Sequence, residues 1–276
     1  MAAARPSIAD KRRSFRELHA AGCFVIPNPW DAGSARYLQS LGFKALATTS
    51  SGFAWSQARA DNGVERDTVL AHLAAMVAST DLPVNADFES GFARDAAGVA
   101  QSVRLAVETG VAGLSIEDST GDTAPLYDLE VAVERMRAAR GAIDKAGGDT
   151  LLVGRAEGFL VGRPDLGETI ARLTAYANAG ADCLYAPGIR TREDIRAVVA
   201  AVAPKPVNLL IGWPSDMTVA DVAALGVRRI SVGGALARSA WGGFMRTAAQ
   251  IAKYGTFGGF ASAASGADLN ALFRPS

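Results

Sequence analysis

The sequence predicts a closed (β/α)8 barrel, the TIM-barrel fold, and three observations lead to that class. The chain has 276 residues, and one barrel of this kind commonly takes about 250 residues as a single domain. The segments between its β-type runs have apolar residues at helical spacing, as in Val69, Leu73, Met76 and Val77. Eight such β-type runs recur, at residues 23–28, 45–50, 83–88, 113–118, 151–157, 182–188, 205–212 and 228–233. Eight alternating units favour a closed barrel over an open sheet.

We expect a single domain over residues 1–276, with an extra element at each end. Ser7 and Asp10 form a capping-box pattern that opens a helix through Ala20, so residues 1–22 are expected to close the bottom of the barrel. The basic residues of this helix are expected to face solvent. Residues 254–276 run through a glycine-rich stretch, which lacks the ending of a phosphate loop, into a short amphipathic helix. They predict a C-terminal helical extension.

Composition narrows the class of partner. Lys plus Arg number 28 and Asp plus Glu number 28, with no basic run longer than residues 11–13, which argues against nucleic acid or an anionic membrane surface as a partner. No apolar run approaches the roughly 20 residues of a membrane span, and the N-terminus lacks a secretory signal pattern. Cys23 and Cys183 fall in predicted strands, which favours buried free thiols over a disulfide or a nucleophile. We therefore expect a cytoplasmic protein with a small-molecule partner.

Acidic side chains gather at the ends of two predicted strands. Alternation in the third run puts Asn85, Asp87 and Glu89 on one face, and the fourth run puts Glu117 on the equivalent face. Active sites of this fold lie at the carboxyl ends of the strands. Asp87, Glu89 and Glu117 are thus expected to hold a metal or act in catalysis, with a structural ion-pair network as the alternative. Asp118, on the opposite face, could cap the segment that follows.

The type of ligand points to a hard cation. Carboxylate oxygens without neighbouring histidine or cysteine select magnesium, with manganese as the second choice. His19 and His72 fall on predicted outer helices, where a packing or surface role is expected. Their position argues against a zinc site.

Other polar residues fall at predicted strand ends. Arg155 could bind a substrate carboxylate or phosphate, or form a structural bridge to Glu117, and the two roles are compatible. Asn208 could face the pocket or satisfy neighbouring backbone. Backbone N–H groups around Ser51 and Gly52 could cradle a carboxylate or a developing enolate. Residues 231–234, Ser-Val-Gly-Gly, could grip a phosphate or could allow close helix packing.

Six short motifs occur together and in order. The chain resembles the isocitrate lyase/phosphoenolpyruvate mutase superfamily in Pro27-Asn-Pro-Trp-Asp31, Ala47-Thr-Thr-Ser-Ser-Gly-Phe53, Asp87-Phe-Glu-Ser-Gly91, Ile116-Glu-Asp118, Gly154-Arg-Ala-Glu157 and Ala179-Gly-Ala-Asp182. The resemblance covers almost the whole chain. It implies a (β/α)8 barrel enzyme that uses Mg²⁺ on 2-oxo acids or their enolates. It also implies a homotetramer, in which the last helices are often exchanged between neighbouring barrels.

The same resemblance implies roles for individual residues. Asp87, Glu89 and Glu117 would hold the ion, partly through water. Ser51, Gly52 and Phe53 would bind the substrate, Asp61 would lie beside the reacting centre, and Arg155 would hold the far group or stabilise charge.

The chain also departs from the family pattern. Isocitrate and methylisocitrate lyases carry a Lys-Lys-Cys-Gly-His loop after the fourth strand, whereas residues 119–127 here contain no cysteine. Phosphonate-handling members use a histidine near the sixth strand, and residues 183–188 contain none. The usual Arg-Thr-Asp of the fifth strand is here Arg155-Ala-Glu157, a change next to the expected site.

The leading hypothesis is a Mg²⁺-dependent lyase or hydrolase that cleaves a carbon–carbon bond next to a 2-oxo acid or enolate. It would resemble an oxaloacetate hydrolase or a 2-alkylmalate or methylisocitrate lyase. The alternatives are a weakly active 2-oxo acid binding protein and a phosphonopyruvate hydrolase or phosphoenolpyruvate mutase. A Schiff-base aldolase is least favoured, because Lys44 and Lys205 lie at strand beginnings.

Overall fold

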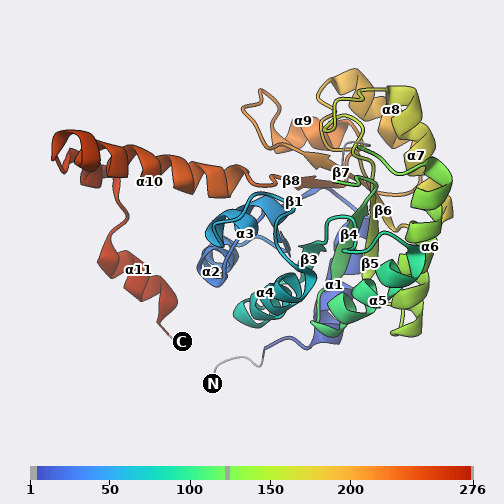
Figure 1. Ribbon diagram of the computed structural model, residues 1–276, viewed down its shortest axis with the longest axis horizontal. Coiled ribbons are helices and arrows are strands. Elements are labelled where there is room, and N and C mark those ends of the chain that lie inside the picture. Colours follow the sequence, from blue (N-terminus) through green and yellow to red (C-terminus); the bar gives the residue numbers. More distant parts are fainter. Residues whose placement is uncertain (1–4, 122–124, 275–276) are drawn as a thin grey trace.

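The computed structural model describes residues 5–121 and 125–274, and at its centre is a nearly closed barrel of parallel strands (Figure 1). The strands pair in the order β1-β8-β7-β6-β5-β4-β3-β2. Between the two ends of this sheet, the Ala47 N–H donates to the Pro27 carbonyl at 3.1 Å. The predicted (β/α)8 class is confirmed. The strands are β1 (Phe24–Ile26), β2 (Leu46–Ala47), β3 (Val84–Asp87), β4 (Gly113–Glu117), β5 (Leu151–Arg155), β6 (Cys183–Tyr185), β7 (Val207–Leu210) and β8 (Arg229–Ser231).

Helices follow the strands and cover the outside of the barrel (Figure 1). Several begin at a side chain that accepts a hydrogen bond from the first turn, as Asp95, Asp165 and Thr191 do. The elements are α1 (Ile8–Ala20), α2 (Ala32–Ser40), α3 (Ser50–Ser56), α4 (Arg66–Ser79), α5 (Ala96–Glu108), α6 (Leu129–Lys145), α7 (Leu166–Asn178), α8 (Arg192–Val202), α9 (Val219–Ala224), α10 (Ala235–Tyr254), the 3₁₀ helix η1 (Gly258–Ser262) and α11 (Gly266–Phe273).

The main hydrophobic core lies between the strands and the surrounding helices. Leu73, Phe88, Met136 and Tyr176 are each fully or almost fully buried there. Complete burial of an apolar side chain of this size stabilises the fold by about 1.5–3 kcal/mol. With the hydrophobic packing outside the barrel wall, the inward-facing strand positions are free to carry polar groups.

Helix α1 closes the bottom of the barrel, as predicted. Ser7 and Asp10 form the expected capping box, and Phe15 inserts among the apolar residues at the base of the strands. The solvent-facing prediction for its basic residues is wrong for Lys11 and Arg12. Lys11 Nζ donates to the Thr80 carbonyl at 2.6 Å, and Arg12 Nη2 donates to the Val107 carbonyl at 2.8 Å. These cations bind carbonyls near the C-terminal ends of α4 and α5, where partners within the helix are lacking.

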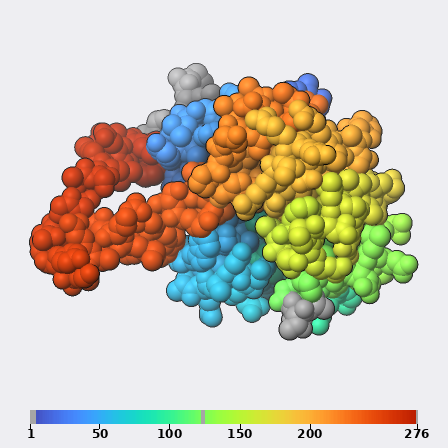
Figure 2. All heavy atoms as spheres, turned by 90° about the horizontal axis from the view of Figure 1, so that it is seen from above, coloured from blue at the N-terminus to red at the C-terminus, as the bar shows by residue number. Residues whose placement is uncertain are grey.

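The predicted C-terminal extension is the distal part of a longer arm that begins with α10. Only Ala237 of this 20-residue helix is buried. Figure 2 shows the arm standing off the body of the molecule before η1 and α11 turn back. At its end the Arg36 guanidinium lies 5.8 Å from the centre of the Phe273 ring, so α11 returns toward α2. In the described part of the chain, no helix is long and apolar enough to cross a lipid bilayer.

Candidate active site

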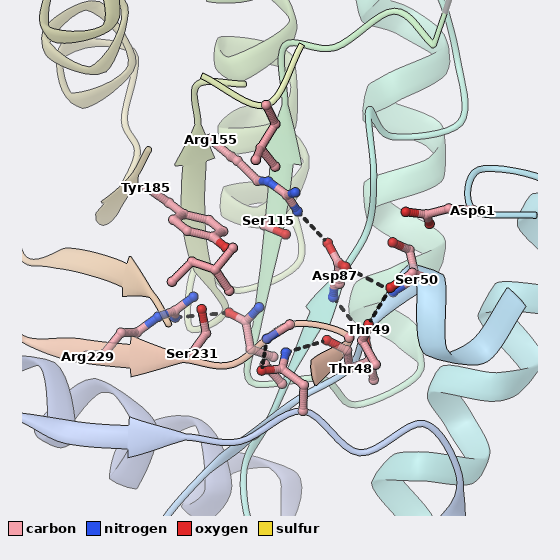
Figure 3. A pocket seen from close by; sticks show the side chains of 18 residues that line it. Thr48, Thr49, Ser50, Asp61, Asp87, Ser115, Arg155, Tyr185, Arg229 and Ser231 are labelled. Carbon is pink, nitrogen blue, oxygen red and sulfur yellow. Dashed lines mark hydrogen bonds and ion pairs between the residues drawn. The ribbon is translucent and has the colours of Figure 1, made fainter. Parts of the chain in front are cut away.

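A polar cavity of about 180 Å³ opens where the carboxyl ends of the strands meet (Figure 3). Parallel register brings its walls together, because Asp87 pairs with Ser115, Glu117 pairs with Arg155, and Arg155 pairs with Tyr185. Asp61 approaches from the loop between α3 and α4 and also lines the cavity. The structure therefore brings together side chains from distant segments, as the strand-end argument predicts.

Arg155 is the centre of the charged side of this cavity. Its Nη1 lies 3.0 Å from Asp87 Oδ1 and 3.3 Å from Glu117 Oε2, and its Nε contacts Glu157 Oε1. Burial lowers the pKa of Arg155, but the charges of Glu157, Glu117 and Asp87 outweigh it and raise that pKa well above its usual range. The bridge to Glu117 exists, and Arg155 also lines the cavity, so both functions considered for it are compatible with the geometry.

The position of Asp87 is determined by a second set of contacts. Its Oδ2 accepts a hydrogen bond from the Ser50 N–H at 3.0 Å, and its own N–H donates to Thr48 Oγ1 at 2.9 Å. Both partners lie just beyond β2. The Asp87 carboxylate is thus held between the start of α3 and Arg155.

The negative charges of the acids around Asp87 are only partly balanced by nearby positive charge. Burial raises the pKa of Glu89 to about 8, and the charges of Asp87 and Asp61 add to that effect. Burial also raises the pKa of Glu117 well above its usual range, with Arg155 offsetting only part of it. Loss of solvent and the Asp87 charge raise the pKa of Asp61. The excess of carboxylates around the Arg155 guanidinium fits a bound cation.

Glu89 does not continue the strand row from which it was predicted. Strand β3 ends at Asp87, and the Glu89 backbone is left-handed, with φ of 48°. Its side chain lies beside Asp87 in a small adjoining space next to His72. Among the described residues, no group of three or more His, Cys, Asp or Glu side chains has metal-holding geometry. The three predicted ligands are neighbours without forming a closed cage.

Among the described residues, the side-chain partners of Asp118 lie just beyond β5 and on α7 rather than in the loop that follows β4. Its Oδ1 accepts from the Glu157 N–H at 2.8 Å, and its Oδ2 accepts from the Tyr176 hydroxyl at 2.6 Å and from Arg172 Nη1 at 3.2 Å. Asp118 faces helix α7, where two donors reach it, and the capping role considered for it is not seen among the described residues. Its contacts hold the backbone that presents Glu157 to Arg155.

The side chains of residues 51–53 face different parts of the structure, with Ser51 at the cavity and Phe53 in the core. Ser51 lines the cavity. The Gly52 N–H bonds Thr49 Oγ1 at 3.3 Å, and a Cβ at Gly52 would lie 2.7 Å from the Thr49 methyl. Phe53 is buried and its ring stacks on His72, with centroids 3.7 Å apart. Within this segment, Ser51 has the side chain that reaches the cavity.

Gly233 and Gly234 after β8 line the cavity, and Gly234 also allows close packing, so both roles considered for these glycines are compatible with the geometry. A Cβ at Gly234 would lie 2.7 Å from Ser51 Oγ and 3.2 Å from the Trp55 ring. Ser231 lines the cavity two residues after Arg229 on the same strand face.

Asn208 lies below the cavity, and three further residues that the sequence pattern did not single out line it. Asn208 is fully buried, donates to Ser231 Oγ at 2.9 Å and accepts from Arg229 Nε at 2.8 Å, and it is not among the cavity's lining residues. Ser115, Tyr185 and Arg229 do line the cavity. Strand alternation could have found all three, because each lies two residues from another inward position.

Comparisons with known proteins agree with this architecture. The family model described as phosphoenolpyruvate phosphomutase matches residues 15–252. The crystal structure of a lyase/mutase candidate from Burkholderia cenocepacia is 47% identical, with a TM-score of 0.93 and 97% of each chain covered. That of 2,3-dimethylmalate lyase is 26% identical, with a TM-score of 0.84, covering 97% of this chain and 94% of that one.

A curated relative, the oxaloacetate decarboxylase of Bradyrhizobium diazoefficiens, is 29% identical over 224 residues, or 78% of this chain and 74% of its own. The family match extends from α1 to α10 and includes every strand that lines the cavity. The chain belongs to the phosphoenolpyruvate phosphomutase family, within the isocitrate lyase/phosphoenolpyruvate mutase superfamily.

Proposed function

We propose that this protein is a Mg²⁺-dependent lyase or hydrolase that cleaves a carbon–carbon bond next to a 2-oxo acid or enolate. The observation that carries the proposal is the cavity in which Asp87 and Glu117 share Arg155 at 3.0 and 3.3 Å. Relatives named as an oxaloacetate decarboxylase and a 2,3-dimethylmalate lyase support the same reaction class.

The residues fit a magnesium ion. The donors are carboxylate oxygens in excess of positive charge, and Mg²⁺ typically uses one or two carboxylates while keeping several waters. Asp87 would be the direct anchor, with Glu89 and Glu117 holding the ion's waters, which agrees with the open arrangement of these acids. Mn²⁺ suits the same donors. When bound, the ion would supply Lewis-acid stabilisation of enolate charge.

The remaining cavity residues support the other parts of this reaction. Ser51 would bind the carboxylate end of the substrate, assisted by the backbone at Gly52, while Phe53 supports α3 from the core. Arg155 stays protonated and would offset negative charge as it develops. The raised pKa of Asp61 lets its carboxyl exchange a proton closer to neutral pH, which suits a role in positioning a proton or an attacking water.

The loop after β4 differs from that of the isocitrate and methylisocitrate lyases. Residues 119–121 and 125–127 of the loop after β4 are described, while residues 122–124 lie outside the described residues. No part of this loop contains a cysteine. This composition favours a reaction other than isocitrate or methylisocitrate cleavage by the cysteine route.

The test is a pyruvate- and oxalate-release screen over 2-oxo and 2-hydroxy diacids, with and without Mg²⁺. We expect metal-dependent release from at least one diacid and its loss in Asp87→Ala. Oxalate release from oxaloacetate would indicate a hydrolase. Pyruvate release from a branched malate would indicate a lyase. Tight oxalate binding without any product would instead identify a binding protein, and metal-independent turnover would remove the ion from the mechanism.

We further propose that the chain forms a homotetramer in which the arm packs on neighbouring barrels. Phe244 and Met245 of α10 are each 61% exposed, and Phe257 of the arm is also 61% exposed. Large apolar side chains exposed together along one element usually mark a protein interface. Light scattering should give four copies for the full chain and a smaller assembly after removal of residues 255–276; a monomeric full chain would contradict this assembly.

A further inference from the structure

Arg229 is a buried cation with neutral hydrogen-bond partners. Its side chain is 2% exposed. Its Nε donates to Asn208 Oδ1 at 2.8 Å, its Nη1 donates to Asn85 Oδ1 at 3.3 Å, and Nη1 also lies 3.4 Å from His19 Nε2. No ion pair among residues 5–121 and 125–274 includes Arg229.

This environment is unusual for an arginine. Removing a charge from water costs several kcal/mol unless an opposite charge compensates it. Arg155, in the same barrel, has three carboxylates around it. Burial lowers the pKa of Arg229, and no carboxylate is among the causes that act on it. The positive charge of Arg229 is therefore available to an anion from outside the chain.

The cavity reaches this guanidinium. Arg229, Tyr185 and Ser231 all line it, at the end away from Asp61. Figure 3 shows Arg229 beside Ser231, on the far side of Tyr185 from Arg155. Asn208 orients two of these groups at once, since it accepts from Arg229 and donates to Ser231. A guanidinium and two hydroxyl groups that line the same cavity are a donor set suited to a carboxylate.

We propose that Arg229 binds the second carboxylate of the substrate and selects diacids over monoacids of the same length. The inference rests on the proposed function for the reacting end of the ligand, which would lie toward Asp87 and Arg155. Recognition at Arg229 is itself independent of turnover. A monoacid would leave the buried charge of Arg229 uncompensated. The resulting difference in binding free energy between a diacid and a monoacid sets the specificity.

The test compares malate with 2-hydroxybutyrate, which share a four-carbon 2-hydroxy acid skeleton and differ by the terminal carboxylate. Calorimetric titrations of the full-length protein are run with and without Mg²⁺. We expect wild-type protein to bind malate about tenfold or more tightly than 2-hydroxybutyrate, since a hydrogen bond to a charged group contributes on that scale. In Arg229→Met the ratio should fall to about one, because malate weakens and 2-hydroxybutyrate changes little.

The neighbouring arginine provides a matched control. Arg228 points the other way and donates to the Gly22 carbonyl, so Arg228→Met should keep the wild-type ratio. Arg229→Lys keeps the charge and should retain part of the preference. If Arg229→Met fails to fold, the wild-type and Arg229→Lys ratios decide the question. A wild-type ratio near one, or an equal loss of both ligands in either Arg229 variant, would overturn the proposal.

Failure of this subsite and failure of the proposed function are distinguishable. If the protein catalyses no cleavage, the preference for malate still tests Arg229. If the preference is absent while Mg²⁺-dependent turnover of a diacid is present, the second carboxylate is recognised elsewhere and the proposed reaction stands.

Discussion

Arg155 Nη1 lies 3.0 Å from Asp87 Oδ1, so the residue proposed to anchor the ion is already paired with the cavity's central cation. Asp87 also accepts the Ser50 N–H at 3.0 Å. Two donors on one carboxylate hold its oxygens in place before any ligand arrives. This arrangement couples strand β5 to the start of α3 through a single side chain and makes Arg155 important for stability as well as chemistry.

Replacing Arg155 with methionine should lower the free energy of unfolding by about 3–5 kcal/mol, because buried carboxylates lose their shared partner. Urea unfolding at pH 7 measures the loss. The control is Arg104→Met, which removes an exposed pair with Glu108 and should cost about 0.5 kcal/mol or less. Equal losses in the two variants would contradict a central role for Arg155.

Stability should fall as pH rises when no divalent ion is present. The folded-state pKa of Glu89 is raised to about 8 from an ordinary 4.5, so the folded protein holds a proton that the unfolded chain has released between these values. Free energy of unfolding should therefore decrease from about pH 5 to pH 8, by roughly 3–4 kcal/mol for this group.

Thermal unfolding in a chelator across that pH range measures this slope. Glu89→Gln should make the slope shallower, with the raised pKa values of Glu117 and Asp61 accounting for what remains. Mg²⁺ should restore stability at pH 8 in the wild-type protein by binding the ionised form. A slope of the opposite sign, or one unchanged in Glu89→Gln, would show that Glu89 is not the titrating group.

Gly234→Ala should disturb ligand binding through Ser51. The new Cβ would lie 2.7 Å from Ser51 Oγ, so the hydroxyl must move, while the Gly234 backbone at φ −70° accepts alanine. We expect oxalate affinity to fall about three- to tenfold, with a change in stability below about 1 kcal/mol. Gly141→Ala, where nothing lies within 4 Å of the added atom, is the control and should bind oxalate normally. Unchanged affinity in Gly234→Ala would remove Ser51 from the binding site.

Arg135→Met should weaken metal binding, although Arg135 is not one of the predicted metal ligands. The buried Arg135 guanidinium donates to the Ala93 carbonyl at 2.7 Å and also to the Ser90 carbonyl, which immediately follows Glu89. Loss of these bonds frees the loop, so Mg²⁺ affinity measured by calorimetry should drop about tenfold or more. The exposed neighbour Arg137 is the matched position, and Arg137→Met should bind Mg²⁺ as wild type does. Equal affinities in the two variants would exclude this positioning role.

The sequence by itself determined the class of fold and the inward row of polar strand residues. Alternation along a strand is a local property, so Asp87, Glu117 and Arg155 could be assigned to one face before any contact was known. Strand alternation does not account for Glu89, because β3 ends at Asp87 and the backbone turns left-handed at residue 89, although the Glu89 side chain still lies beside Asp87. The alternation of side chains between the two faces does not extend beyond the hydrogen-bonded strand.

Only the tertiary structure decided which charges compensate one another. Arg155 and Arg229 are both strand arginines that line the cavity, yet one lies among three carboxylates and the other among amides and an imidazole. Likewise, the Lys11 ammonium finds helix-end carbonyls, and Asp118 finds donors from α7. These pairings join residues far apart in the chain, and their energies depend on distance and desolvation, which barrel closure sets and local sequence does not encode.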